Sequence, residues 1–96
     1  MIVEIDKDLE DIFPRYLQAR RDDLVKLRDC LSQGDFAFLQ NFGHKIAGNA
    51  GAYGLDAYGK LARQLEAAAR SQDAKECTSC VESMAVYLHA LEARFV

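Results

Sequence analysis

Two amphipathic helical patterns separated by a glycine lie in residues 35–70, DFAFLQNFGHKIAGNAGAYGLDAYGKLARQLEAAAR. In the first pattern, at about 100° per residue, one arc holds Phe38, Leu39, Phe42, Ile46, Asn49, Ala50 and Tyr53. Asp35 is suited to cap this helix, which is predicted to run to about residue 52, and Gly54 breaks the chain after it. A second apolar stripe then predicts a helix over about 55–70. The stretch therefore predicts two packed helices.

The rest of the chain shows the same helical spacing of apolar residues. Pro14 suits the first position of a helix over 14–32, which Gln33 and Gly34 end. A polar turn at 71–73 precedes a predicted helix over 74–94, and residues 6–13 predict a short extra N-terminal helix. Because short loops favour antiparallel neighbours, we expect an all-α, up-down-up-down four-helix bundle. No strand alternation is found, and residues 1–96 are expected to form one domain.

Composition and charge narrow the class of protein. The 96 residues carry 12 basic and 15 acidic side chains, a net charge of -3, which argues against nucleic acid or an anionic membrane as partner. No apolar run approaches the roughly 20 residues that span a bilayer. The first ten residues are rich in acids and hold no apolar block, so no signal peptide is predicted. We expect a cytoplasmic monomer.

The three cysteines, Cys30, Cys77 and Cys80, leave one alternative open. Cys77 and Cys80 form a CxxC pattern, which is also found in zinc and redox sites. A structural zinc site needs four ligands, and no second closely spaced pair of ligands exists in the sequence. The spacing also suits two side chains on the buried face of a helix. We therefore favour a core role, with metal or redox chemistry as the alternative.

His44 lies about 180° from the centre of the apolar arc of its helix, so it is predicted to face solvent. The residues around it on that face are small or polar and carry no charge: Ala37, Gln40, Asn41, Ala47, Gly48 and Gly51. Gly43, Gly48 and Gly51 interrupt the helix at a cost of about 1 kcal/mol each relative to Ala. A helix accepts that cost where something must approach its backbone closely. This pattern favours a functional histidine over an incidental surface one.

A neutral imidazole offers a nucleophilic nitrogen, but the sequence around His44 completes no hydrolytic site. No Ser or Cys lies within one helical turn, and no carboxylate lies three or four residues away. The chain also has no Gly-rich phosphate loop followed by Lys, so transfer from ATP is not expected. These features are typical of a carrier that accepts a group from one protein and passes it to another.

Residues 44–54, HKIAGNAGAYG, resemble the signature H-x-[LI]-K-G-[SN]-[AS]-x-x-[LIF]-G of histidine-containing phosphotransfer (HPt) domains. Residues 61–70, LARQLEAAAR, are similar to the L-x-x-x-L-E-x-A-A-R segment of the same family. The resemblance implies a four-helix bundle in which His44 is phosphorylated on Nε2. It implies two kinds of partner, a response-regulator receiver domain and a sensor or hybrid histidine kinase. It also implies that Mg²⁺ belongs to the receiver, and that this chain needs no metal or other cofactor.

One position departs from the family pattern. The Lys expected three residues after the histidine is Ala47, so Lys45, Lys60 and Arg63 are candidate cations for holding a phosphoryl group. Together with Gln40, Gly48 and Gly51 they are the predicted phosphoryl and docking residues around His44. The resemblance implies a phosphoryl carrier rather than an ATP-dependent kinase. An HPt-shaped module that docks a receiver or kinase without being phosphorylated is the alternative.

Overall fold

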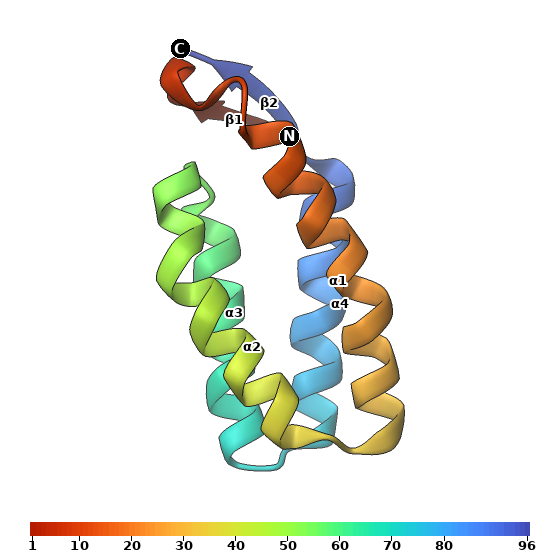
Figure 1. The fold of residues 1–96 in the computed structure, drawn as a ribbon. Helices are drawn as coiled ribbons and strands as arrows, with labels where there is room; N and C mark the ends of the chain where they lie inside the picture. The colour runs from red at the N-terminus through yellow and green to blue at the C-terminus, as the bar shows by residue number, and fades with distance from the viewer.

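The computed structural model describes residues 1–96 and confirms four helices. They are α1 (Phe13–Gln33), α2 (Phe36–Asn49), α3 (Asp56–Arg70) and α4 (Ala74–Ala90). In Figure 1, α2 and α3 lie side by side in one half of an elongated molecule, α1 and α4 lie in the other, and successive helices run in opposite directions. The molecule measures 39 × 20 × 19 Å. None of the helices combines the length and apolar character needed to cross a lipid bilayer.

The predicted caps define where the central helices begin and end. The Asp35 side chain accepts a hydrogen bond from the backbone N–H of Phe38 at 3.1 Å, and Gly34 before it has a positive φ of 67°. The α-helical part of α2 ends at Asn49, earlier than predicted, and a 3₁₀ helix, η2 (Ala50–Tyr53), continues it. Gly54 closes η2 with a φ of 81°. Such left-handed backbone favours glycine, which explains the break between α2 and α3.

The prediction that the chain contains no strands is wrong at both ends. Strand β1 (Ile2–Ile5) pairs in parallel with β2 (Glu92–Phe95). The expected helix over 74–94 therefore stops at Ala90, and Leu91 is already extended, with φ -68° and ψ 129°. The apolar side chains at 88, 91 and 95 fit helical spacing, which concealed the alternating burial of the last residues. Pairing with β1, remote in sequence, decides the local structure instead.

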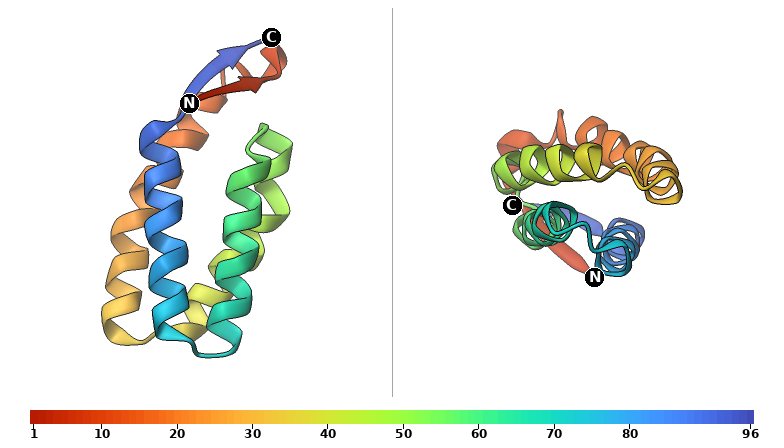
Figure 2. Two further views of the ribbon diagram at one scale, coloured as in Figure 1. Left: turned by 180° about the vertical axis from the view of Figure 1, so that it is seen from behind. Right: turned by 90° about the horizontal axis from the view of Figure 1, so that it is seen from below.

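The expected extra helix over 6–13 is reduced to one 3₁₀ turn. This turn, η1 (Lys7–Leu9), begins after Asp6, whose side chain accepts a hydrogen bond from the backbone N–H of Asp8 at 2.9 Å. The turn carries the chain from the end of β1 to the start of α1. Figure 2 shows this segment and the two strands together at one end of the bundle. The segment is too short for a regular α-helix because β1 and α1 occupy the residues on either side.

The core is a single cluster of buried apolar side chains contributed by all four helices, and no charged or polar side chain is buried with them. Leu27, Leu39, Leu65 and Met84 are among the residues with no exposed surface. Ile5 and Leu91 extend the cluster under the sheet. The two termini are therefore part of the folded domain.

All three cysteines are buried in this core as free thiols. Burial raises the pKa of the Cys77 thiol and, with the nearby Glu76 carboxylate, raises that of Cys80 to about 11. No three His, Cys, Asp or Glu side chains lie close enough together to hold a metal ion. The structure therefore gives Cys77 and Cys80 the packing role that the sequence favours.

We expect the buried cysteines to react with a thiol reagent only when the protein opens. At pH 7 both thiols are protonated, and the thiolate is the reactive form. A colorimetric thiol assay on the native protein should therefore show slow labelling, with rapid labelling of all three cysteines in denaturant. Fast labelling of Cys77 or Cys80 in the native state would favour the redox alternative.

Candidate functional site

His44 lies in the second half of α2, and its side chain is 79% exposed. Its Nδ1 atom is 2.9 Å from Oε2 of Glu66 on α3, whose side chain is only 15% exposed. The same Glu66 oxygen accepts a hydrogen bond from a guanidinium nitrogen of Arg70 at 3.3 Å. Glu66 therefore fixes one side of the imidazole ring while the rest of the ring remains in solvent.

The contact with Glu66 determines which ring nitrogen is available for chemistry. A carboxylate can only accept a hydrogen bond, so Nδ1 carries the proton in this pair. In the neutral ring, Nε2 then has the free lone pair. Because His44 makes no other hydrogen bond, Nε2 is available to a molecule that approaches from solvent. The arrangement presents an oriented nucleophile without a substrate pocket of its own.

Glu66 was not predicted as a partner of His44 because the two residues are 22 positions apart in the sequence. Only carboxylates within one helical turn of His44 were considered. The buried residues of α2 and η2 are Leu39, Gly43, Ile46 and Ala50. On the helical wheel, the centre of these buried residues is rotated by about 50° from the centre of the predicted apolar arc. The rotation is toward the side of α2 that packs on α3. His44 still faces solvent, but it lies closer to α3 than predicted. The Glu at position 66, in the L-E-x-A-A-R segment, was the available signal.

Gly43 allows this close approach of α3, so the neighbour that needs glycine at this position is a helix of the same chain. A Cβ atom at Gly43 would stand 2.6 Å from the backbone oxygen of Ala62 and 2.8 Å from the backbone nitrogen of Glu66. These distances are shorter than real contacts, and backbone atoms cannot move aside easily. Gly43 thus belongs to the α2–α3 interface and brings the Glu66 backbone next to the helical turn of His44.

Gly48 and Gly51 lie on open surface, as the sequence predicts. A Cβ atom at Gly48 would meet no atom within 4 Å, and at Gly51 it would meet only the Asp56 carboxylate, at 3.2 Å. Neither glycine has a positive φ. Packing within the chain therefore does not require glycine at position 48, and a side chain there would extend into solvent on the His44 side of α2.

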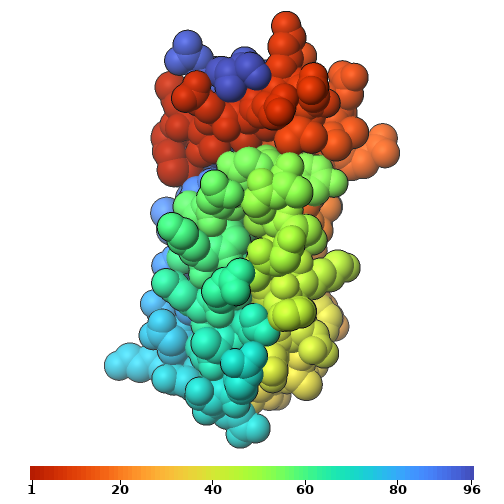
Figure 3. Space-filling model, turned by 90° about the vertical axis from the view of Figure 1, so that its left-hand side faces the viewer, coloured from red at the N-terminus to blue at the C-terminus, as the bar shows by residue number.

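Two of the three candidate cations lie together. Lys60 and Arg63 of α3 line an open depression with Ala47 and Gly51 of the α2–η2 segment. Figure 3 shows the face of the molecule that is formed by α2 and α3. Lys45 lies apart from this depression, beside Phe38, Asn41 and Phe42. Gln40 is half-buried and lines neither depression.

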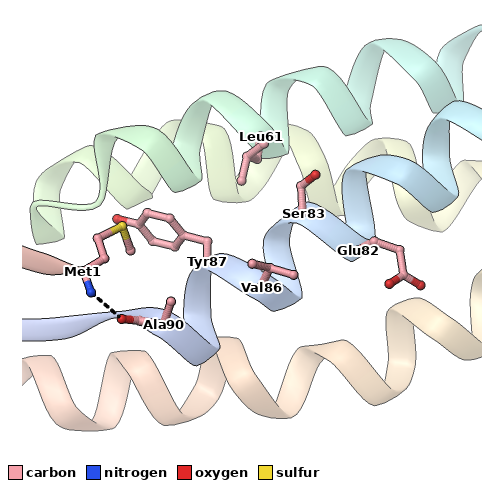
Figure 4. A pocket seen from close by; sticks show the side chains of 7 residues that line it. All are labelled: Met1, Leu61, Glu82, Ser83, Val86, Tyr87 and Ala90. Carbon is pink, nitrogen blue, oxygen red and sulfur yellow. Dashed lines mark hydrogen bonds between the residues drawn. The ribbon is translucent and has the colours of Figure 1, made fainter.

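The most apolar depression of the surface is separate from these residues. It lies between α3 and α4, and Figure 4 shows Leu61, Val86 and Tyr87 around it, with Met1 at one end. None of the predicted site residues lines it. His44 lines none of the depressions of the surface, so its exposed ring does not lie in a small-molecule pocket.

The family model described as Hpt domain matches residues 11–94. No curated protein and no solved structure matches the chain. The family match covers α1, α2, α3 and α4, including His44 and Glu66. The chain therefore belongs to the Hpt domain family.

Proposed function

We propose that this protein carries a phosphoryl group on Nε2 of His44 and exchanges it with an aspartate of a response-regulator receiver domain. The family match identifies a phosphotransfer-type module of two-component signalling. The observation that supports the specific role is the His44–Glu66 pair, which leaves a single oriented ring nitrogen exposed to solvent. A partner protein can reach this nitrogen, and the partner supplies the rest of the catalytic site.

The proposed step exchanges one bond for another. The Nε2 lone pair attacks the phosphorus of the aspartyl phosphate, the N–P bond forms, and the P–O bond to the aspartate breaks. Mg²⁺ bound to the receiver's own acidic residues would supply charge stabilisation for the oxygens of the phosphoryl group. Positive charge develops on the imidazole ring, next to the Glu66 carboxylate that accepts from Nδ1–H. The reverse reaction passes the phosphoryl group to a second receiver, and no ATP is consumed on this chain.

The role of Glu66 is to position the ring and compensate its charge. We expect Glu66→Ala to slow transfer roughly ten- to a hundred-fold, because in-line attack tolerates little misplacement of the nucleophile. Glu66→Gln keeps an oxygen that accepts from Nδ1–H and should recover much of the rate. Rapid-quench transfer from a phosphorylated receiver measures both variants. Equal rates for the alanine variant and the parent would show that Glu66 does not position His44.

Lys60 and Arg63 are proposed to take the place of the family Lys that is missing at position 47. Their depression includes Ala47 itself, so their charges lie on the side of α2 where that Lys would extend. A cation stabilises phosphoryl oxygens through charge-assisted hydrogen bonds. Lys45 and Gln40 are proposed to contact the docked receiver at the periphery, since neither shares this depression.

Restoring the missing Lys should lengthen the life of the phosphorylated protein. We expect Ala47→Lys to slow loss of phosphate from His44 by roughly two- to five-fold, the size of one exposed charge contact of about 0.5–1 kcal/mol. Ala37→Lys adds the same charge on the outward face, nearly three helical turns before position 47, and is the matched control. The decay of phosphohistidine at neutral pH gives both lifetimes. Identical decay of Ala47→Lys and the parent would mean that Lys45, Lys60 or Arg63 already fills the role, or that no cation is needed there.

Transfer from a phosphorylated receiver tests the proposed function directly. The protein is mixed with receiver domains of its source organism that have been phosphorylated with acetyl phosphate. The products are then analysed for acid-labile, base-stable phosphate. We expect stoichiometric phosphohistidine with at least one receiver. Receiver binding without any transfer would instead establish the docking-only module.

A further inference from the structure

The two-stranded sheet at the end of the bundle has one edge with unused hydrogen-bonding groups. In β2, Glu92 N–H donates to the backbone oxygen of Met1 and Val96 N–H donates to that of Ile5, each at 2.9 Å. Since a ladder uses alternate residues of a strand, Ala93 and Phe95 direct their N–H and C=O groups to the opposite edge. They make no hydrogen bonds there. In Figure 2, left, no other segment lies beyond this outer edge of β2.

The outer edge of β1 has a neighbour beside Glu4 and Ile5, at the end of the strand that faces the turn before α3. A Cβ atom at Gly54 would stand 3.7 Å from the backbone oxygen of Glu4 and 2.9 Å from a side-chain carbon of Ile5. The turn before α3 therefore lies against β1. At its other end, the N-terminal amine of Met1 donates to the backbone oxygen of Ala90 at 3.2 Å (Figure 4). The outer edge of β2 has no such neighbour.

The side chains of β2 indicate which strand fits this edge. Glu92 and Arg94 are exposed and share one face, while Ala93 and Phe95 are half-buried on the other. The Phe95 ring packs edge-on against Phe13, with centroids 5.9 Å apart, which keeps that face on the bundle. In an antiparallel pair, residues directly opposite each other point to the same face. When two copies pair about Ala93, Glu92 of each strand therefore lies opposite the basic side chain at position 94 of the other strand.

We propose that two copies of this chain associate through antiparallel pairing of β2 with β2, centred on Ala93. Ala93 and Phe95 then use their free backbone groups, and Glu92 lies opposite Arg94 of the partner subunit. Within each chain Arg94 is already in register with Glu4. The four-stranded sheet therefore places each Arg94 between two carboxylates. Pairing about Arg94 instead would set two arginines against each other, which disfavours that register.

Such a dimer also accounts for a sheet that is unusually small by itself. A two-stranded sheet is marginal in water, and parallel sheets are normally covered. The new interface is a short strand edge, so we expect weak association. It leaves α2 and the His44 surface outside the contact, so the proposal does not depend on phosphotransfer. It differs from the monomer expected from the sequence.

Sedimentation equilibrium with charge-reversed variants tests this pairing. At concentrations up to about 1 mM, suited to a weak interface, the parent should approach twice the mass of one chain. Glu92→Arg and Arg94→Glu should each lose this association, because both create like charges across the pair. An equimolar mixture of the two variants should regain it as a heterodimer, since two basic side chains on one strand then face two acidic side chains on the other. The substituted side chains are exposed, and circular dichroism confirms that each variant is folded.

Matched controls carry the same charge changes far from the sheet. Asp29→Arg and Arg28→Glu lie on exposed positions near the other end of α1 and should leave the dimer unchanged. Amide exchange of Ala93 and Phe95 should slow as the parent concentration rises, and should not slow in either variant alone. A parent that stays monomeric, a dimer that tolerates both single reversals, or a mixture that fails to associate would each overturn the proposal.

Discussion

Phosphoryl uptake should disappear when His44 is replaced by glutamine. Glutamine retains a polar side chain of similar length but has no nucleophilic nitrogen. Because the His44 side chain is 79% exposed, the free energy of unfolding should change by no more than about 0.5 kcal/mol. Labelled phosphate transferred from a receiver, followed alongside thermal unfolding, measures both effects on the same preparation. The variant should be folded, dock the receiver and carry no phosphate.

The second histidine provides the matched control for this experiment. His89 is exposed on α4, far along the chain from the α2–α3 surface, and it makes no hydrogen bond to a carboxylate. His89→Gln should therefore accept phosphate at the parent rate. Phosphate uptake by the His44 variant, or loss of phosphate uptake in the His89 variant, would identify His89 as the phosphoacceptor.

The same substitution should change the free energy of unfolding in opposite directions at two glycines of α2. At Gly43, an added Cβ would overlap backbone atoms of Ala62 and Glu66, at 2.6 and 2.8 Å. We expect Gly43→Ala to lower the free energy of unfolding by about 2 kcal/mol, despite a helix-propensity gain of up to about 1 kcal/mol. A Cβ atom added at Gly48 would have no neighbouring atom within 4 Å. Gly48→Ala should therefore keep the gain in helix propensity and raise the free energy of unfolding. Urea unfolding of both variants measures this difference.

Substitutions at Gly43 and Gly48 should slow phosphoryl transfer for different reasons, the first through packing and the second through docking. Gly43→Ala pushes α3 away from α2 and with it Glu66, so transfer should slow together with the loss of stability. A longer side chain at position 48 extends into solvent beside His44, in the path of an approaching receiver. Gly48→Gln should therefore be more stable than the parent and transfer much more slowly. Unchanged transfer by Gly48→Gln would show that this surface is not where a receiver docks.

The helices could be predicted from the sequence because their signals are local. Apolar spacing, Asp35 as a cap and the glycines at 34 and 54 act within a few residues, and the structure confirms each of them. The strands could not be predicted in this way. Glu92–Phe95 becomes a strand because it pairs with Ile2–Ile5 from the other end of the chain. In isolation the last residues fit the end of a helix.

The site was predictable in part for the same reason. Exposure of His44 follows from the periodicity of its own helix, and the open surface at Gly48 follows with it. The Glu66 contact depends on how α2 rotates against α3, which Gly43 controls through packing. A helical wheel treats each helix alone and contains no such information. The family resemblance covered the segment with Glu66 but gave it no role.

Nitrogen–phosphorus coupling in the NMR spectrum of the phosphorylated, ¹⁵N-histidine-labelled protein tests the central claim most directly. The spectrum identifies which histidine, and which of its ring nitrogens, bears the phosphoryl group. We expect one coupled nitrogen, Nε2 of His44, with Nδ1 still protonated and hydrogen-bonded to Glu66. Coupling at Nδ1 of His44, or at either nitrogen of His89, would contradict the account.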